Sequence, residues 1–447
     1  MNKNLTKRRF RQIEIAIRKL ILKLPERTLL VLICILIGVV AGISAFLLKS
    51  LLQYVHNFIG FFNNRGLSNI LLVTFPALGL FLCVLYIKVV HPKGLKKGIS
   101  QILDSIRNKS SIIEPNQTYG HIISSSFTIG FGGSAGFEAP IVATGSAIGS
   151  NIARFFKIPE NDRAVLLASG AAAGISAIYN APIAGVLFAI EVLLVNMSVT
   201  AFIPLLLSSA TAAIISRILF HGQLFVLITK QWTLNALPIY VLLGVLAGFY
   251  SVLIIRQSIK ISKAFNKIDN IWIRVIIGSI VLSPLIFVFP SLFGEGYFSV
   301  QSILNRQEIS ILNTSILHLD SNLFFIPIVA LLFVKIYATG VTISAGGNGG
   351  IFAPSLFMGA FLGYLISRTL NLTGLTELNV VNFTVAGMAG VLSGVIKIPL
   401  TAIFLIAEIT GGYVLLVPLM IVSALSYFIS YYFESKSIYT KELELKA

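Results

Sequence analysis

A stretch rich in glycine and proline occurs twice, and the two copies constrain the fold more than any other feature of the chain. Residues 132–140 read GGSAGFEAP and residues 346–354 read GGNGGIFAP, at a constant offset of 214 (346 − 132). Residues 170–191 and 387–408 match at nearly the same distance, 217 (387 − 170), and each of these stretches contains a proline and ends in a glutamate. Two long matches in register indicate an internal duplication.

Both copies lie within long apolar runs. The chain has 447 residues and a mean hydropathy of +0.90, with 56% apolar and 11% charged residues. A soluble domain of this length would carry more charge, so the composition predicts an all-α polytopic protein of the lipid bilayer. The net charge of +17 comes from short basic segments beside the apolar runs. These segments indicate membrane orientation and not binding to nucleic acid.

The order of apolar and basic segments predicts two repeats that cross the membrane in opposite directions. A basic cluster precedes the first apolar run of the first repeat, Thr28–Val55, but follows that of the second, Ile239–Ile255. Because positive charge stays in the cytoplasm, both termini are predicted to be cytoplasmic in a multi-pass protein of the plasma (inner) membrane. The predicted parts are a basic cytoplasmic N-terminal helix (1–27), a first transmembrane repeat (28–221), an inter-repeat linker (222–236), a second, inverted transmembrane repeat (237–432) and a C-terminal segment (433–447).

An inverted repeat with broken helices predicts half-helices that meet near the midplane of the membrane. Pro140 and Pro354 suit the first turn of a helix, so residues 136–140 and 350–354 are predicted helix starts. A helix start presents unpaired N–H groups and about half a positive charge. Two facing starts therefore predict an anion site without a fully charged side chain. Rapid permeation requires such a site, because the bound ion must also leave.

Glu138 lies in the first copy of the repeated stretch, and Phe352 occupies the equivalent position of the second. A carboxylate at this depth costs several kcal/mol unless it is paired, hydrated or protonated, which makes it a functional candidate. A side chain that reaches an interface or caps a helix is the alternative. Ionised, Glu138 would occupy the anion site; protonated, it would swing away. We therefore predict a single protonatable gate at Glu138.

The remaining polar residues indicate no second site. The five histidines show no metal-ligand spacing, and Cys34 and Cys83 lie within apolar runs as packing residues. Neither a metal nor another cofactor is predicted. No base–nucleophile pair or metal cluster accompanies Glu138, so an enzyme is not expected. Glu191 and Glu408 occupy equivalent positions in the two repeats, and we expect a structural role for both.

These motifs resemble those of the CLC family of chloride channels and chloride/proton antiporters, and the resemblance covers essentially the whole chain. Residues 136–140 correspond to the family's G-(K/R)-E-G-P motif, and residues 350–354 are its intact G-x-F-x-P motif. Residues 180–185, NAPIAG, are similar to its N-A-P-L-A-G segment. Tyr439 matches the tyrosine whose hydroxyl closes the inner side of the central site. The similarity is to prokaryotic members, without C-terminal regulatory domains.

The resemblance implies a CLC-type inverted repeat with re-entrant helices, assembled as a homodimer with one pathway per subunit. It implies chloride as the transported ligand, exchanged for protons in the antiporters, and it assigns the external gate to Glu138. The residues implied to surround the anion are Gly350, Ile351, Phe352, Tyr439, Gly98 and Lys97.

The sequence departs from the family pattern at three places. Phe137 and Ala139 replace a cation and a glycine beside the gate. Residues 96–100 read KKGIS where the family has G-S-G-I-P, so Lys97 replaces a serine that usually contacts chloride. A lysine there suits anion contact or a solvated cytoplasmic face, and both interpretations stay open. The nitrate-selective members have proline and the fluoride exporters methionine at this position, so neither substrate is indicated. Val192 lies where antiporters usually have an internal, proton-accepting glutamate.

Valine cannot relay a proton, so the sequence favours channel-like, passive chloride conduction that opens when Glu138 is protonated. The alternative is a chloride/proton antiporter, because family members that lack the internal glutamate include antiporters. A third interpretation is another inverted-repeat carrier that moves an organic anion. Such a carrier would have a bulkier and more polar cavity at the midplane.

Overall fold

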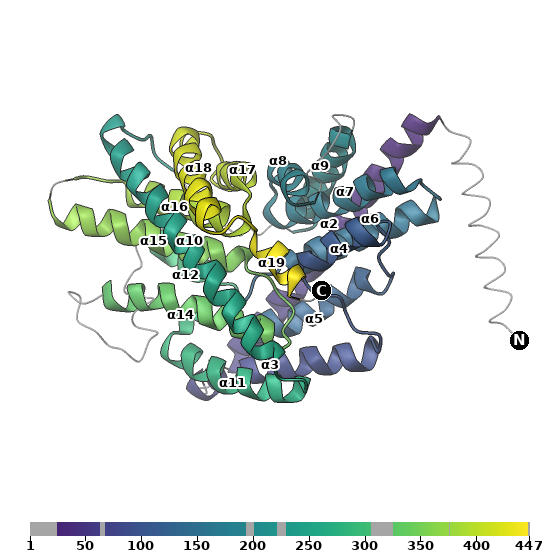
Figure 1. The fold of residues 1–447 in the computed structure, drawn as a ribbon, viewed down its shortest axis with the longest axis horizontal. Helices are drawn as coiled ribbons and strands as arrows, with labels where there is room; N and C mark the ends of the chain where they lie inside the picture. Colours follow the sequence, from purple (N-terminus) through teal and green to yellow (C-terminus); the bar gives the residue numbers. More distant parts are fainter. Residues whose placement is uncertain are drawn as a thin grey trace, which may run out of the picture.

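The computed structural model describes residues 25–62, 68–193, 201–220, 229–304, 325–374 and 376–445, and their named elements are helices (Figure 1). The predicted N-terminal helix over residues 1–27 lies almost entirely outside the described residues, as does the first part of the predicted linker, 222–228. The boundaries of the five predicted parts therefore stay predictions.

The described residues contain seven helical segments that are long and apolar enough to cross a membrane. The apolar run Thr28–Val55 lies in the first of these and the run Ile239–Ile255 in the fourth, and both helices continue further than their apolar runs. The helices in these segments are α2 (Glu26–Phe62), α3 (Ser68–Val90), α9 (Phe202–Leu219), α10 (Leu237–Asn266), α11 (Ile271–Val288), α14 (Phe325–Ser344) and α18 (Leu416–Phe433).

The other described helices are shorter or less apolar, and several begin directly after glycine or proline. A π-helical turn, η2 (Ala189–Leu193), follows α8, and 3₁₀ turns occur at η4 (Leu234–Ala236) and η5 (Pro290–Leu292). The α-helices are α4 (Ile99–Asn108), α5 (Gln117–Gly130), α6 (Glu138–Phe155), α7 (Glu160–Tyr179), α8 (Pro182–Phe188), α12 (Tyr297–Leu304), α15 (Phe352–Leu372), α16 (Val380–Ile396), α17 (Pro399–Ile409) and α19 (Ile438–Glu444).

The two repeats are built on the same helix contact. In the first repeat α6 packs on α7 so closely that a Cβ at Gly145 would lie 2.0 Å from the Gly170 carbonyl oxygen. In the second repeat α15 packs on α16, and a Cβ at Gly359 would lie 2.3 Å from the Gly387 carbonyl oxygen. Small residues allow this approach where lipid provides no hydrophobic drive for association. Figure 1 shows α6–α9 on one side of the molecule and α15–α18 on the other.

The repeated stretches meet through a short antiparallel bridge between Gly136 and Gly350. The Gly136 N–H donates to the Gly350 carbonyl, the Gly350 N–H donates to the Gly136 carbonyl, and both bonds are 2.8 Å long. The two glycines are equivalent under the offset of 214, so each pairs with its own counterpart. The bridge therefore lies on the pseudo-two-fold axis that relates the two repeats.

Glu191 and Glu408 connect the repeats a second time, because each caps a helix of the other half. Glu408 accepts hydrogen bonds at 3.0 and 2.8 Å from two backbone N–H groups in the first turn of α8. Glu191 accepts them at 2.9 and 2.8 Å from the first turn of α17, and a third from the Thr401 hydroxyl at 2.6 Å. Each carboxylate pairs N–H groups that a helix start leaves unpaired. This geometry agrees with the expected structural role.

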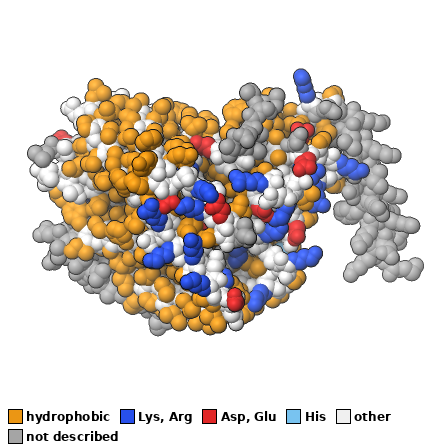
Figure 2. All heavy atoms as spheres, in the orientation of Figure 1, with side chains coloured by type: hydrophobic (Ala, Val, Ile, Leu, Met, Phe, Trp, Pro, Cys, Tyr) orange, Lys and Arg blue, Asp and Glu red, His pale blue; other side chains and the backbone are white. Residues whose placement is uncertain are grey.

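The surface divides into apolar flanks and a basic centre. Figure 2 shows apolar side chains over the flanks, and Lys and Arg gathered near the middle of this face, where Figure 1 places α10, α4 and α19. The second half of α10 contributes the exposed basic side chains Arg256, Lys260 and Lys263 there, and exposed Lys267 follows directly after the helix. A basic surface of this kind attracts anions before they reach a binding site.

Candidate functional site

The two predicted helix starts lie where the sequence places them. α6 begins at Glu138 and α15 at Phe352, each directly after the segment that contains its bridging glycine. Pro140 and Pro354 lie in the first turns, where a missing N–H costs no helical hydrogen bond. The bridge holds the two starts together, so the unpaired N–H groups of both helices gather at the centre of the molecule.

A cavity of about 240 Å³ lies beside these helix starts, lined by the segment before α4, the C-terminal parts of α10 and α14, the start of α11, and α19. We call it the Tyr439 cavity. A water molecule occupies about 30 Å³ in the liquid, so the cavity has room for a small anion and several waters. The predicted anion-binding residues that line it are Lys97, Gly98, Gly350, Ile351 and Tyr439. Phe352 follows directly and is fully buried, with its ring 5.9 Å from that of Tyr179.

The Tyr439 cavity is lined by hydroxyl groups without partners. Tyr439 is 3% exposed, and its hydroxyl has no hydrogen-bond partner in the described part of the chain. The hydroxyls of Ser258 on α10 and Thr339 on α14 line the same cavity and also lack a partner there. A buried donor without a partner costs free energy that a bound ligand restores. No motif marks Ser258 or Thr339, and their only signal in the sequence is a hydroxyl within an apolar helix.

Lys97 lies at the Tyr439 cavity. Its side chain is half-buried, and its ammonium donates a hydrogen bond to the Gly346 carbonyl. The neighbouring Gly98 has a φ of +85°, which a residue with a Cβ adopts only under strain, and this turn brings Lys97 towards the second repeat. Arg274 and Glu442 also line the cavity, with opposite charges. Lys97 therefore lines the cavity, and both interpretations of its role stay open.

Glu138 lies between the two helix starts. The side chain is fully buried, and its Oε2 atom accepts a hydrogen bond from the Ala353 N–H of α15 at 3.3 Å. Its Oε1 atom lies 2.6 Å from the Tyr179 hydroxyl and 2.5 Å from the Tyr297 hydroxyl. The carboxyl group thus occupies one N–H donor at the start of α15. Sequence reasoning did not find the two tyrosines, since no spacing relates positions 138, 179 and 297.

The residues that replace the family's cation and glycine beside the gate make its surroundings apolar. Phe137 is 1% exposed, and its ring packs edge-on against Tyr297 with centroids 5.8 Å apart. Ala139 is buried and lines the Tyr439 cavity. A buried cation occurs nearby on α14, where Lys335 donates to the Gly294 carbonyl at 3.3 Å and lies 4.8 Å from the Phe357 ring.

The position of the internal glutamate is apolar in the structure as well. Val192 lies on the π-helical turn η2, half-buried and packed against the hydrophobic core. The adjacent carboxylate, Glu191, accepts three hydrogen bonds at the start of α17. Val192 has no carboxylate, and both carboxylate oxygens of Glu191 already accept hydrogen bonds from α17. Neither residue therefore provides a free carboxylate to accept a proton at this position.

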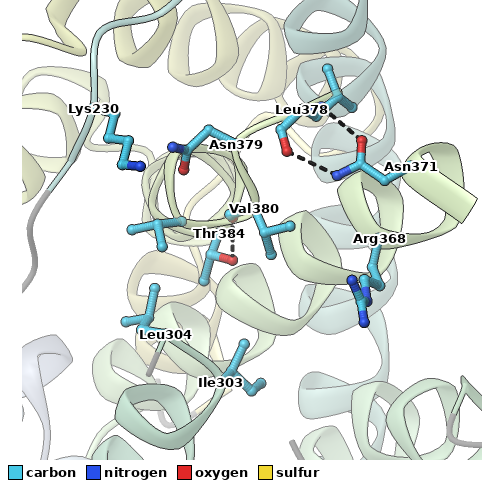
Figure 3. Close-up of a pocket in the computed structure, with 10 residues that line it drawn as sticks. Lys230, Ile303, Leu304, Arg368, Asn371, Leu378, Asn379, Val380 and Thr384 are labelled. Atoms are coloured by element: carbon cyan, nitrogen blue, oxygen red, sulfur yellow. Dashed lines mark hydrogen bonds between the residues drawn. The ribbon is translucent and has the colours of Figure 1, made fainter. Parts of the chain in front are cut away.

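Other features do not suggest a different site. Within the described residues, no group of three His, Cys, Asp or Glu side chains lies close enough to bind a metal, and Cys34 and Cys83 are buried free thiols. A cavity of about 350 Å³ lies between the end of α15, the start of α16 and α12 (Figure 3). Its polar lining includes Arg368 and Asn371. The side-chain amide of Asn371 donates a hydrogen bond to the Leu378 carbonyl and accepts one from the Leu378 N–H. None of the predicted site residues lines this second cavity.

Comparison with known proteins confirms the resemblance that the motifs indicate. Residues 78–431 match the profile of the family described as voltage gated chloride channel. The H(+)/Cl(−) exchange transporter ClcA of Vibrio cholerae is 31% identical over 310 residues, which cover 66% of this chain and 62% of that protein. A protein of Ralstonia nicotianae, provisionally named chloride channel protein ClcB-like, is 28% identical over 362 residues, 78% of this chain and 80% of that protein.

Solved structures show the same fold. The structure of a slow cyanobacterial Cl⁻/H⁺ antiporter superposes with a TM-score of 0.80 at 22% identity, covering 95% of this chain and 98% of that one. A CLC-type fluoride/proton antiporter gives a TM-score of 0.74 at 23% identity, covering 93% and 98%. At such identities the likeness shows the fold alone. The family profile, the relatives and the fold together place the chain in the CLC family, as an all-helical, multi-pass membrane protein that transports anions and is not an enzyme.

Proposed function

We propose that the chain exchanges chloride for protons across the plasma (inner) membrane, as a homodimer with one pathway per subunit and cytoplasmic termini. One observation carries this proposal: the protonatable carboxyl of Glu138 lies at the N–H donors of the facing helix start, where an anion would bind. Exchange requires one group that both carries protons and competes with the anion, and Glu138 has this position.

Chloride would be held by dipoles and hydroxyls. The N–H groups at the start of α15, at Ile351 and Phe352, and the Tyr439 hydroxyl are the proposed ligands, with Gly350 shaping the backbone between them. The partnerless hydroxyls of the Tyr439 cavity extend this donor set, and Lys97 adds a positive charge. Ionised Glu138 excludes chloride from the amides, whereas protonated Glu138 no longer competes with it. Proton binding and anion binding thereby become coupled.

The sequence alone favours passive chloride conduction. The names of the relatives favour chloride/proton exchange instead. ClcA of Vibrio cholerae and of Vibrio vulnificus are named exchange transporters, and the cyanobacterial protein of the same fold is an antiporter. The match spans 62% of each ClcA protein, so their activity supports the proposal for this chain without establishing it. Passive conduction remains the second candidate, favoured by Val192 and by the engagement of Glu191 with α17. In exchange, protons would have to reach Glu138 through water.

Simultaneous chloride and proton recording from proteoliposomes tests the proposal. We expect a chloride gradient to drive protons uphill in the wild type. Glu138→Gln should abolish this pumping while chloride still flows, with much less dependence on pH. Glu160→Gln is the matched control, because Glu160 is an exposed carboxylate in the first turn of another helix, α7, and should leave pumping unchanged.

Two outcomes would change the conclusion. Chloride flux without proton movement in the wild type would establish passive conduction. Flux of sulfate or phosphate as fast as that of chloride and bromide would contradict the small-anion site, and faster movement of fluoride would change the proposed substrate.

A further inference from the structure

Three oxygen atoms form a closed triangle at the gate. Glu138 Oε1 lies 2.6 Å from the Tyr179 hydroxyl and 2.5 Å from the Tyr297 hydroxyl, and the two hydroxyls lie 2.6 Å from each other. The tyrosines come from the end of α7 and the start of α12, and both are 6% exposed. The triangle is therefore buried within the protein.

The triangle contains more contacts than two phenols can supply with hydrogens. Each contact has the length of an O–H···O hydrogen bond, which needs a hydrogen between its oxygens. The two phenols supply two hydrogens, and an ionised carboxylate supplies none. If both phenols donate to Glu138, the two phenol oxygens face each other at 2.6 Å with only lone pairs between them. A protonated carboxyl adds the third hydrogen, so that each oxygen donates once and accepts once.

We propose that Tyr179 and Tyr297 are positioning residues that bind Glu138 in its protonated form and hold the transported proton in a ring of three hydrogen bonds. This inference rests on the proposed function of Glu138 as the protonatable gate and deepens it. The proton arrives from water and forms an O–H bond at Oε1. When it leaves to water, the ring opens, and the ionised carboxylate keeps the Ala353 N–H.

Three further groups interact electrostatically with members of the ring or with each other. Glu295, two residues before Tyr297, is close enough to Tyr179 to interact with it electrostatically. Lys335 on α14 interacts with Glu295. Tyr439 interacts with Glu138. All of these groups stay in place when only the hydroxyl of Tyr179 or Tyr297 is removed.

The rings of both tyrosines are held independently of their hydroxyls. Tyr179 lies 5.9 Å from the Phe352 ring, and Tyr297 lies 5.8 Å from the Phe137 ring. Tyr179→Phe and Tyr297→Phe therefore remove the hydrogen bonds and keep the packing. Tyr250→Phe is the matched control, because the Tyr250 hydroxyl donates to the Leu332 carbonyl at 2.6 Å, away from the gate.

The experiment is a titration of chloride binding against pH, by calorimetry on the detergent-purified full chain. Chloride competes with the ionised gate, so the midpoint of the profile reports the protonation of Glu138. Removing either hydroxyl takes away two of the three hydrogen bonds in the ring that contains protonated Glu138. It takes away only one of the two hydrogen bonds that the phenols can form around ionised Glu138. We expect each variant to shift the midpoint towards acid by about one pH unit, a tenfold loss of proton affinity, and Tyr250→Phe to leave it unchanged.

An unchanged midpoint would overturn the proposal. So would a shift towards alkaline pH, which would mean that the phenols stabilise the ionised carboxylate instead. Infrared spectroscopy provides a second measurement if one variant folds poorly: the wild type should show a protonated-carboxyl band that Glu138→Gln lacks, and its absence would refute the ring. Chloride binding does not require exchange. Passive conduction by the wild type would therefore refute the proposed function and leave this result intact.

Discussion

Replacing Gly350 by alanine is expected to separate the two helix starts at the centre of the molecule. A Cβ on Gly350 would lie 2.7 Å from the Cβ of Ala139. That atom belongs to the first turn of α6 and is fixed to the backbone, so no side-chain rotation removes the clash. Ordinary contacts begin at 3.4 Å, so the two segments must part by about 0.7 Å (3.4 − 2.7).

The bridge between Gly136 and Gly350 cannot absorb this displacement. Its two hydrogen bonds are 2.8 Å long and would approach 3.5 Å (2.8 + 0.7), the limit of a hydrogen bond. A buried polar group that loses its partner costs about 1–3 kcal/mol, and overpacking costs about as much again. We expect the free energy of unfolding to fall by about 3 kcal/mol. Chloride transport should fall as well, since the amides of Ile351 and Phe352 move with Gly350.

Thermal unfolding in detergent and chloride efflux from proteoliposomes measure the two effects. Gly412→Ala is the control, because a Cβ at Gly412 meets nothing within 4 Å and its φ is not left-handed. A Gly350→Ala protein that melts and transports like the wild type would show that the bridge does not hold the site together.

Two further predictions concern charged residues. Lys97→Ser should weaken chloride binding several-fold by calorimetry, because a unit charge pair at about 4 Å gains roughly 4 kcal/mol at an effective dielectric of about 20, before desolvation is subtracted. Unchanged binding would contradict a role for Lys97 at the anion. Glu408→Gln should lower the free energy of unfolding by about 1 kcal/mol through the loss of a charged cap on α8, with chloride efflux unchanged; an unchanged melting temperature would contradict the cap.

Local signals explain why the sequence predicts the centre of the fold. Glycine and proline at 136–140 and 350–354 determine helix starts through backbone conformation and missing N–H groups, which act within a few residues. The structure accordingly begins α6 and α15 in these stretches. The offset between Glu191 and Glu408 likewise shows that they are equivalent. It does not show that each caps a helix of the other repeat, because that contact joins residues about 210 positions apart (401 − 191).

The side chains around the gate were beyond prediction for the same reason. Tyr179 and Tyr297 approach Glu138 only after three separate helices pack together. A hydroxyl such as that of Ser258 in an apolar helix has no distinguishing pattern until a cavity forms beside it. Even the first span was predicted too short, since α2 continues as a helix beyond its most apolar part.

The exchanged caps of Glu191 and Glu408 also bear on the origin of the chain. Each half leaves one helix start uncapped and supplies the carboxylate that the other half lacks. Two separate copies of a half-length ancestor, inserted in opposite orientations, would complete each other by these same contacts. Such an ancestor would have both helix starts capped only as an antiparallel pair. Fusing the two genes would then add no new contact and would only guarantee that every molecule contains one copy in each orientation.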